Sequence, residues 1–117
     1  MTNERSYRPL VYICSRFAGD EEGNLRKTGE FCRFAMEVGM IPLSGTLAFS
    51  PFLNDESVAD RSQALSWDMI LMGKCDEVWA LVTEEGISPG MTLEIARAKK
   101  RRQTIRYFNE RFEEVQL

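Results

Sequence analysis

The sequence predicts an α/β fold in which a parallel sheet of four to five strands lies between two layers of helices. Short apolar runs rich in strand-forming residues alternate along the chain with longer segments whose apolar residues recur at helical spacing. Each helical segment is long enough to cross over a sheet, which makes the neighbouring strands parallel. With 117 residues the chain has the length of one domain, so a single domain over residues 1–117 is expected.

The first two predicted strands flank the first predicted helix. Residues 9–15 (PLVYICS) form the first apolar run, and residues 40–43 form a second, shorter run. Between these runs, apolar residues fall on one face of a helix that begins with Asn24 as its N-cap and ends at Gly39. A loop containing Gly, Ser and Pro is expected from there to Asn54.

The second half of the chain continues the alternation. A helix over residues 56–72 is expected, with Asn54 or Asp55 as its N-cap. A strand, a helix and a last strand follow, over residues 77–82, 91–100 and 104–108. The pattern after residue 108 favours no single element. Right-handed crossovers between these strands give a flavodoxin-like or Rossmann-like three-layer sandwich.

The composition narrows the classes of function. The net charge of −3 provides no basic surplus for binding a nucleic acid polymer, and no run of about 20 apolar residues could span a membrane. With no signal peptide and three cysteines that lack CxxC spacing, we expect a cytoplasmic protein with reduced thiols. The chain has no histidine, which excludes Ser–His and Cys–His catalysis and leaves acid–base chemistry to carboxylates, tyrosine or lysine. We expect neither a metal site nor a cofactor.

Ligands of such sheets bind beyond the carboxyl ends of the strands. These ends are followed by residues 15–24, 43–54 and 83–90. In the last segment Gly90 lets the backbone approach a ligand, and Ser88 offers a hydroxyl at the start of a helix. Glu94 lies just inside that helix, near its inward stripe, where the helix dipole favours the ionised carboxylate. The alternative is that Ser88 is an N-cap and Glu94 an ordinary first-turn carboxylate.

Asp68 is a carboxylate among apolar neighbours at the edge of a buried helix face, which is costly unless the group is paired or functional. Alternatively it is a boundary residue that reaches water or an arginine. Tyr12 and Ser15 end the first strand, and their alternative roles are a core aromatic and a turn residue. The predicted catalytic residues are Glu94, Asp68 and Tyr12. The predicted substrate-binding residues are Ser15, Ser88, Gly90 and Asn24.

In their order and spacing these residues resemble the nucleoside 2-deoxyribosyltransferase superfamily. The resemblance covers residues 11–108 and is strongest to a small bacterial and phage branch similar to 2′-deoxynucleoside 5′-phosphate N-hydrolase. It rests on four features in chain order: Tyr12-Ile13-Cys14-Ser15 at the end of a strand, Asp68 on a helix, a strand introduced by Asp76, and Ser88-Pro89-Gly90-Met91-Thr92-Leu93-Glu94 followed by Ala98.

The resemblance implies cleavage of the N-glycosidic bond of a (deoxy)nucleoside or its 5′-phosphate. Glu94 would attack C1′ and form a glycosyl-enzyme intermediate, Asp68 would orient the sugar or assist departure of the base, and Tyr12 would hold Glu94. Ser88 and Ser15 would contact a phosphate.

The resemblance also implies a homo-oligomer in which a neighbouring subunit completes the site. The apolar loop over residues 47–53 supports this expectation, because it would be costly to leave exposed in a monomer. Two alternatives stay open: a non-catalytic nucleotide-binding module on the same fold, and a structural oligomer that uses its strand-end loops for protein contact.

Overall fold

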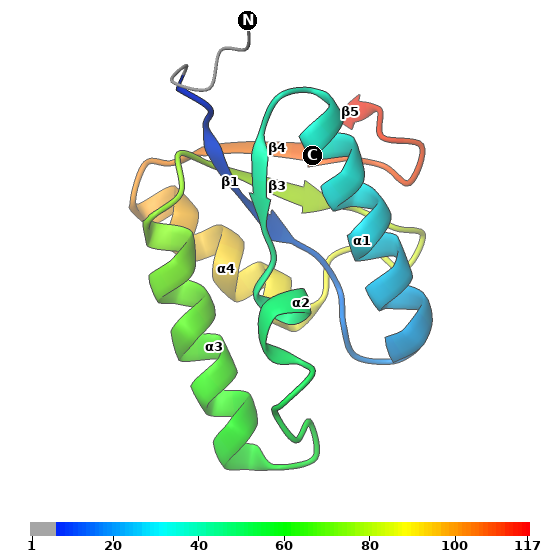
Figure 1. The fold of residues 1–117 in the computed structure, drawn as a ribbon, viewed down its shortest axis with the longest axis vertical. Helices are drawn as coiled ribbons and strands as arrows, with labels where there is room; N and C mark the ends of the chain where they lie inside the picture. Colours follow the sequence, from blue (N-terminus) through cyan, green and yellow to red (C-terminus); the bar gives the residue numbers. More distant parts are fainter. Residues whose placement is uncertain (1–6) are drawn as a thin grey trace, which may run out of the picture.

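A five-stranded sheet forms the centre of the structure, a computed structural model that describes residues 7–117 (Figure 1). In chain order the elements are β1 (Leu10–Cys14), α1 (Glu21–Glu37), β2 (Ile41–Leu43), α2 (Gly45–Phe49), α3 (Val58–Gly73), β3 (Glu77–Leu81), α4 (Pro89–Lys100), β4 (Thr104–Phe108) and β5 (Glu114–Val115). The strand order across the sheet is β2-β1-β3-β4-β5. No helix in residues 7–117 has the length and apolar character needed to cross a membrane.

The pairing of the strands confirms the predicted α/β fold. β1 and β3 are parallel neighbours at the centre of the sheet, with Tyr12 beside Val78. β2 lies on the outer side of β1 and β4 on the outer side of β3, and both run parallel to this central pair. The chain then reverses after β4, and β5 pairs with it antiparallel. The turn between them is held by Asn109, whose side-chain Oδ1 accepts from the backbone N–H groups of Arg111 and Glu113 at 2.9 and 3.0 Å. The tail that the sequence left unassigned therefore forms the edge of the sheet.

Alternation along β1 sends side chains to two separate cores, one on each face of the sheet. Val11 and Ile13 face a core completed by Phe31 of α1. Tyr12 and Cys14 face the opposite core, which α3 and α4 cover. Figure 1 shows this division, with α1 on one side of the sheet and α3 and α4 on the other. A polar group on Tyr12 is thereby directed toward α4.

The predicted N-caps of the first two long helices are wrong. Helix α1 begins earlier than expected, because Asp20 is its N-cap and accepts from the backbone N–H of Gly23 at 3.1 Å. Asn24 instead lies inside α1. Helix α3 is capped by Ser57, which accepts from the N–H of Asp60 at 3.2 Å, and not by the upstream Asn54 or Asp55. In both regions several residues with capping side chains stand close together, so loop geometry decides between them.

Two further helix starts bear on the site. The segment expected to be an irregular loop contains the short helix α2, capped by Ser44, whose hydroxyl accepts from the N–H of Leu47 at 3.1 Å. Helix α4 begins at Pro89, two residues before the predicted start, because Pro suits the first helical position. Its N-cap is Ser88, whose hydroxyl oxygen accepts from the N–H of Met91 at 3.2 Å.

Candidate functional site

A cleft of about 660 Å³ opens at the carboxyl end of β1, between α2, α3 and the start of α4. Its volume lies within the usual range for small-molecule sites, and it occupies the position at which parallel sheets bind ligands. Six of the seven residues predicted for the site line this one cleft: Tyr12, Ser15, Asp68, Ser88, Gly90 and Glu94.

The seventh predicted residue, Asn24, is buried in α1 and does not line the cleft. Its side-chain amide donates to the backbone carbonyls of Phe17 and Ala18, at 3.0 and 3.2 Å. These bonds hold the loop that follows β1. Asn24 therefore has a structural role, because it fixes the loop whose residues Phe17 and Ala18 line the cleft. Its own side chain does not reach the cleft.

Glu94 is the most buried carboxylate of the cleft, with 7% of its surface exposed. The Tyr12 hydroxyl donates to Glu94 Oε2 at 2.6 Å. Burial, together with the negative charge of Glu94, raises the pKa of Tyr12 well above its usual value, so the hydroxyl stays protonated and remains a donor. Because α4 starts at Pro89, Glu94 lies beyond its first turn. The interpretation as an ordinary first-turn carboxylate is therefore wrong, and so is the expectation that the helix dipole favours its ionised form.

Asp68 completes a pair of carboxyl groups with Glu94. Burial is the largest cause that raises the pKa of Asp68 to about 7, and the negative charge and hydrogen bond of Glu94 add to it. Burial also raises the pKa of Glu94, but the hydrogen bond that it accepts from Tyr12 opposes that rise. Asp68 can therefore hold a proton up to about pH 7, and the Tyr12 hydrogen bond favours Glu94 as the carboxylate of the pair.

The Asp68 carboxyl group packs directly against Gly45, a residue that the sequence analysis did not predict for the site. A Cβ on Gly45 would overlap Asp68 Oδ1, so only glycine leaves room for the carboxyl group against the start of α2. Within the described residues, Asp68 Oδ1 is buried and has no hydrogen-bond partner. An unpaired buried oxygen is costly, and a ligand hydroxyl or amino group in the cleft would satisfy it. The only trace of this contact in the sequence is a glycine directly after the cap residue Ser44.

Polar groups from β1 and α4 line another part of the cleft. Ser15 Oγ lies 2.7 Å from the Thr28 hydroxyl, and the hydroxyl proton of the cap residue Ser88 is free to be donated. Arg16, which the sequence did not single out, also lines the cleft. Its Nη2 donates to the backbone carbonyl of Glu85 at 3.2 Å, and its Nε lies 4.0 Å from the Glu85 carboxylate. At Gly90 an added Cβ would meet nothing within 4 Å, so open space lies beside it.

An aromatic wall faces these polar groups. Phe49 of α2 lines the cleft and packs edge-on against Trp67 of α3, with ring centroids 5.1 Å apart. Phe52 adds a second edge contact to Phe49, at 6.3 Å between centroids. A planar ring of a ligand could lie against such a wall. The sequence placed Phe49 in an apolar loop, but only its contact with α3 turns it toward the cleft.

Charged side chains of both signs line the rim of the cleft. Glu21, Asp55 and Asp60 lie there together with Arg61, whose Nη1 donates to the Asp55 carbonyl at 2.9 Å. A hydrogen bond with Asp55 is the largest cause that raises the pKa of Glu21, which indicates that these carboxyl groups from α1 and from the segment before α3 meet. Among residues 7–117, no group of three or more cysteine, aspartate or glutamate side chains could hold a metal ion.

A family model described as a domain of unknown function, DUF7768, matches residues 9–108. The chain belongs to this family. The matched segment runs from the residue before β1 to the end of β4, so it includes every residue of the cleft described above. No curated protein matches the sequence.

Two solved structures place the DUF7768 chain in a known fold. It is similar to a 2-deoxyribosyltransferase from Bacillus psychrosaccharolyticus, with a TM-score of 0.72 and 15% identity over 92% of this chain and 77% of that one. It is also similar to a 2-desoxiribosyltransferase from Leishmania mexicana, with a TM-score of 0.58 and 13% identity over 86% of this chain and 64% of that one. At these identities the likeness establishes a shared Rossmann-like fold.

Proposed function

We propose that this protein cleaves the N-glycosidic bond of a (deoxy)nucleoside or its 5′-phosphate, with Glu94 as nucleophile. The observation that carries the proposal is the carboxyl pair at the floor of the cleft. Glu94 is held by Tyr12 at 2.6 Å, and Asp68 beside it has its pKa raised to about 7. A carboxylate held by a hydrogen bond, beside a carboxyl group that keeps its proton up to about pH 7, can supply a nucleophile and an acid at one pH. The fold shared with the 2-deoxyribosyltransferases supports the proposal that the substrate is a nucleoside or nucleotide.

The reaction divides into two steps. In the first, a Glu94 carboxylate oxygen forms a bond to C1′ while the bond from C1′ to the base nitrogen breaks, and the proton on Asp68 passes to the departing base. In the second, water or another base attacks C1′ and breaks the ester to Glu94, and the proton of the attacking group returns to Asp68. Tyr12 donates to Glu94 Oε2 throughout and keeps the carboxylate in place.

The lining of the cleft fits the parts of such a substrate. The aromatic wall at Phe49 suits the flat face of a base, and the unpaired Asp68 Oδ1 suits a sugar hydroxyl. Arg16, Ser15 and Ser88 could hold a 5′-phosphate, together with the backbone N–H of Gly90 at the start of α4. Whether water or a second base accepts the sugar decides between a hydrolase and a transferase.

A panel of substrates tests the proposal. The four 2′-deoxynucleosides and their 5′-monophosphates are incubated with the protein, with and without a second free base, and the products are separated by chromatography. Release of free base from at least one compound is expected, and formation of a new nucleoside would identify a transferase. Thermal shift with the same compounds detects binding without turnover. A compound that stabilises the protein but is never cleaved would favour the non-catalytic binding module.

Replacing Gly45 with Ala is expected to lower base release by roughly 100-fold, because the new methyl group displaces the Asp68 carboxyl group. The loss should be largest in kcat, and the pH at which activity declines should move, since Asp68 would no longer contact Glu94 in the same way. Gly29→Ala is the matched control. It lies in α1 with nothing within 4 Å of an added Cβ, so it should leave activity unchanged and stabilise the helix slightly. Equal activities of the two variants would contradict the role of Gly45.

A further inference from the structure

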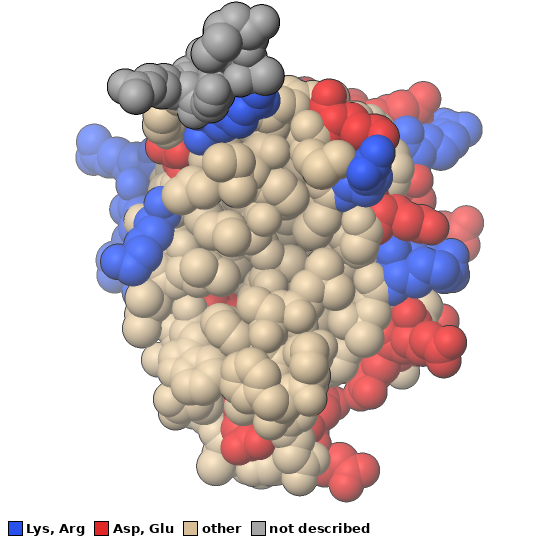
Figure 2. Space-filling view, viewed as in Figure 1, with Lys and Arg blue, Asp and Glu red and all other residues tan. Residues whose placement is uncertain are grey.

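Basic side chains gather where helices α3 and α4 end. One of them follows α3 and the others lie in or just after the last turn of α4, and we call this set the basic pole: Lys74, Arg97, Lys99, Lys100, Arg101 and Arg102. The two helix ends are tied together, because the Gln103 side chain donates to the carbonyl oxygens of Met72 and Cys75 at 2.9 and 3.0 Å. Figure 2 shows Lys and Arg side chains on the left, beside the upper ends of these helices, and acidic side chains at the lower end of the molecule.

Within residues 7–117, no acidic residue forms an ion pair with the basic pole. The ion pairs of this part of the chain use other bases: Arg16, Lys27, Arg33, Arg106 and Arg111. The acidic residues that follow Lys74 in the chain are already engaged, since Asp76 accepts from the backbone N–H of Leu10 at 2.8 Å and Glu77 accepts from the Trp79 ring N–H at 2.8 Å. The negative ends of the two helices favour some of the bases. Together, however, the bases repel one another, and a bound polyanion would stabilise them.

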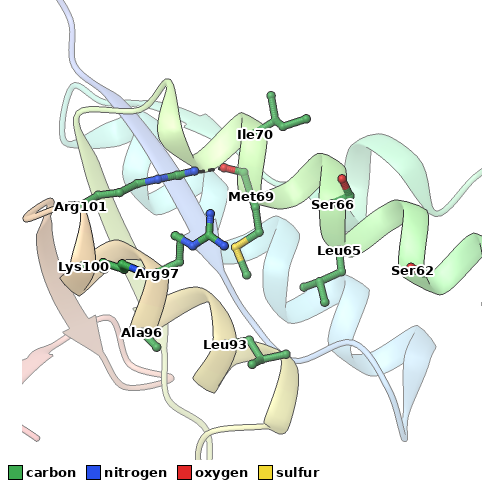
Figure 3. Close-up of a pocket in the computed structure, with 10 residues that line it drawn as sticks. All are labelled: Ser62, Leu65, Ser66, Met69, Ile70, Leu93, Ala96, Arg97, Lys100 and Arg101. Carbon is green, nitrogen blue, oxygen red and sulfur yellow. Dashed lines mark hydrogen bonds between the residues drawn. The ribbon is translucent and has the colours of Figure 1, made fainter.

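The basic pole continues into a concave surface. A groove of about 630 Å³ lies between α3 and α4, and Arg97, Lys100 and Arg101 line one end of it. Figure 3 shows the Arg97 and Arg101 side chains directed toward α3, where Arg101 Nη1 donates to the Met69 carbonyl at 2.8 Å. Leu93 lines the groove further along α4 and is 52% exposed, and no acidic residue of the described chain lines the groove. The groove therefore combines an apolar wall with a cluster of cations.

We propose that the basic pole and the groove bind a single-stranded nucleic acid, with its phosphates at the pole and its bases against the apolar wall. Lys and Arg supply phosphate contacts that position a nucleic acid, and the guanidinium fork of Arg fits a phosphate with two N–H groups. Helical spacing places Arg97 beside Lys100, about 5–6 Å apart at their Cβ atoms. The expectation of no nucleic acid polymer rested on the net charge of −3, which averages over charges that the fold separates.

The choice of a nucleic acid over an acidic protein or an anionic membrane rests on the proposed function. Leu65 lines both the groove and the cleft that contains Glu94, so the two adjoin. Arg97 follows Glu94 on α4 after three residues, which is about 4.5 Å along the helix axis. A nucleic acid strand is the polyanion whose phosphates suit the basic pole and whose nucleosides suit the adjoining cleft. Binding at the pole itself requires no cleavage.

Fluorescence anisotropy of a labelled single-stranded oligodeoxynucleotide of about 12 nucleotides tests the proposal with the full chain. Binding is expected at low salt, and log Kd should rise with log salt with a slope of about 3 if roughly four phosphates are contacted. Poly-glutamate and vesicles of anionic lipid, at the same concentration of charge, should displace the oligonucleotide poorly. Absence of binding at low salt would overturn the proposal. Displacement by poly-glutamate or by the vesicles as efficient as that by unlabelled oligonucleotide would overturn the choice of a nucleic acid.

Two double variants that each remove two positive charges locate the site. Arg97→Gln with Lys100→Gln should raise Kd by roughly 10-fold or more and lower the salt slope by about 1.4, because two phosphate contacts are lost. Arg26→Gln with Arg33→Gln is the matched control, since both arginines are exposed on α1, on the other face of the sheet, and it should raise Kd by about twofold at most. Circular dichroism establishes that both double variants are folded. Equal losses of affinity would mean that binding follows net charge alone and would overturn the basic pole as the site.

This test and the test of the proposed function can fail separately. Anisotropy measures binding whether or not a base is released, and both double variants keep the carboxyl pair and Tyr12. Each should therefore release base from mononucleosides at the wild-type rate. A protein that binds the oligonucleotide through Arg97 and Lys100 but cleaves no nucleoside would keep the nucleic acid site and refute the proposed chemistry.

Discussion

Glu94→Ala is expected to lower base release by roughly 10⁴-fold or more while ligand binding persists. A nucleophile forms a bond that exists only along the reaction path, so its removal acts on kcat far more than on affinity. Glu94→Gln should be equally inactive, because an amide cannot form the glycosyl ester. It should fold better than the alanine variant, since it keeps an acceptor for the buried Tyr12 hydroxyl. Chromatography of released base measures the loss, and thermal shift with the same nucleoside measures binding.

Thr92→Ala is the matched control for the effect of changing α4. Thr92 is exposed on the same helix, and its hydroxyl donates to the Ser88 carbonyl at 3.1 Å. Its loss should cost about 1 kcal/mol of stability at most and leave the rate unchanged. If Glu94→Ala instead cleaves as fast as the wild type and only melts a few degrees lower, Glu94 is structural and the proposed mechanism fails.

Asp68→Asn is expected to slow base release by about 10²–10⁴-fold. The rate of the variant should also no longer fall as the pH rises into the alkaline range. Asp68 can protonate the departing base only in its acid form, and its pKa is raised to about 7. The wild-type rate should therefore fall about tenfold for each pH unit above that value, whereas asparagine does not titrate. The pH profile of kcat for the two proteins measures this difference. A variant whose alkaline decline matches that of the wild type would assign the decline to another group.

Asp68→Asn lowers activity but should raise the stability of the folded protein at alkaline pH. The pKa of Asp68 is raised from 3.8 to about 7, so the folded protein binds this proton more tightly than the unfolded chain does. The contribution is fully present below pH 3.8 and is lost as the pH rises through about 7. Asp68→Asn should then melt several degrees above the wild type at pH 8, and the difference should shrink at pH 5. Such a gain of stability with a loss of activity is expected at functional sites.

Local patterns in the sequence were sufficient to predict the sheet and several of the residues that line the cleft. The apolar runs of β1 and β3 are confirmed as central parallel strands, because buried strands of a parallel sheet are apolar on both faces. Since the carboxyl ends of parallel strands share one edge, Tyr12, Ser88 and Glu94 had to lie near one another. The position of Asp68 beside the apolar face of its helix indicated that its side chain lies near the same edge. These conclusions needed only periodicity and topology.

The helix N-termini show where local patterns were insufficient. Asp20 and Asn24 are both good N-cap residues, and so are Asn54, Asp55 and Ser57. Asp20 and Ser57 are the caps in the structure because the loops before them deliver the chain at the required angle. Asn24, one turn further along, is then free to hold that loop through its amide. The choice depends on how the loop packs, which a single segment does not encode.

The sequence by itself determined the strand order along the chain, the burial of the strands and the carboxylates available for chemistry, because these follow from residue type and spacing. The tertiary structure alone decided which groups touch across long separations in the chain. Gly45 meets Asp68, Arg16 reaches Glu85, and a groove opens between α3 and α4. Each of these features depends on how segments far apart in the chain pack against one another, and that packing has no local signature in the residues.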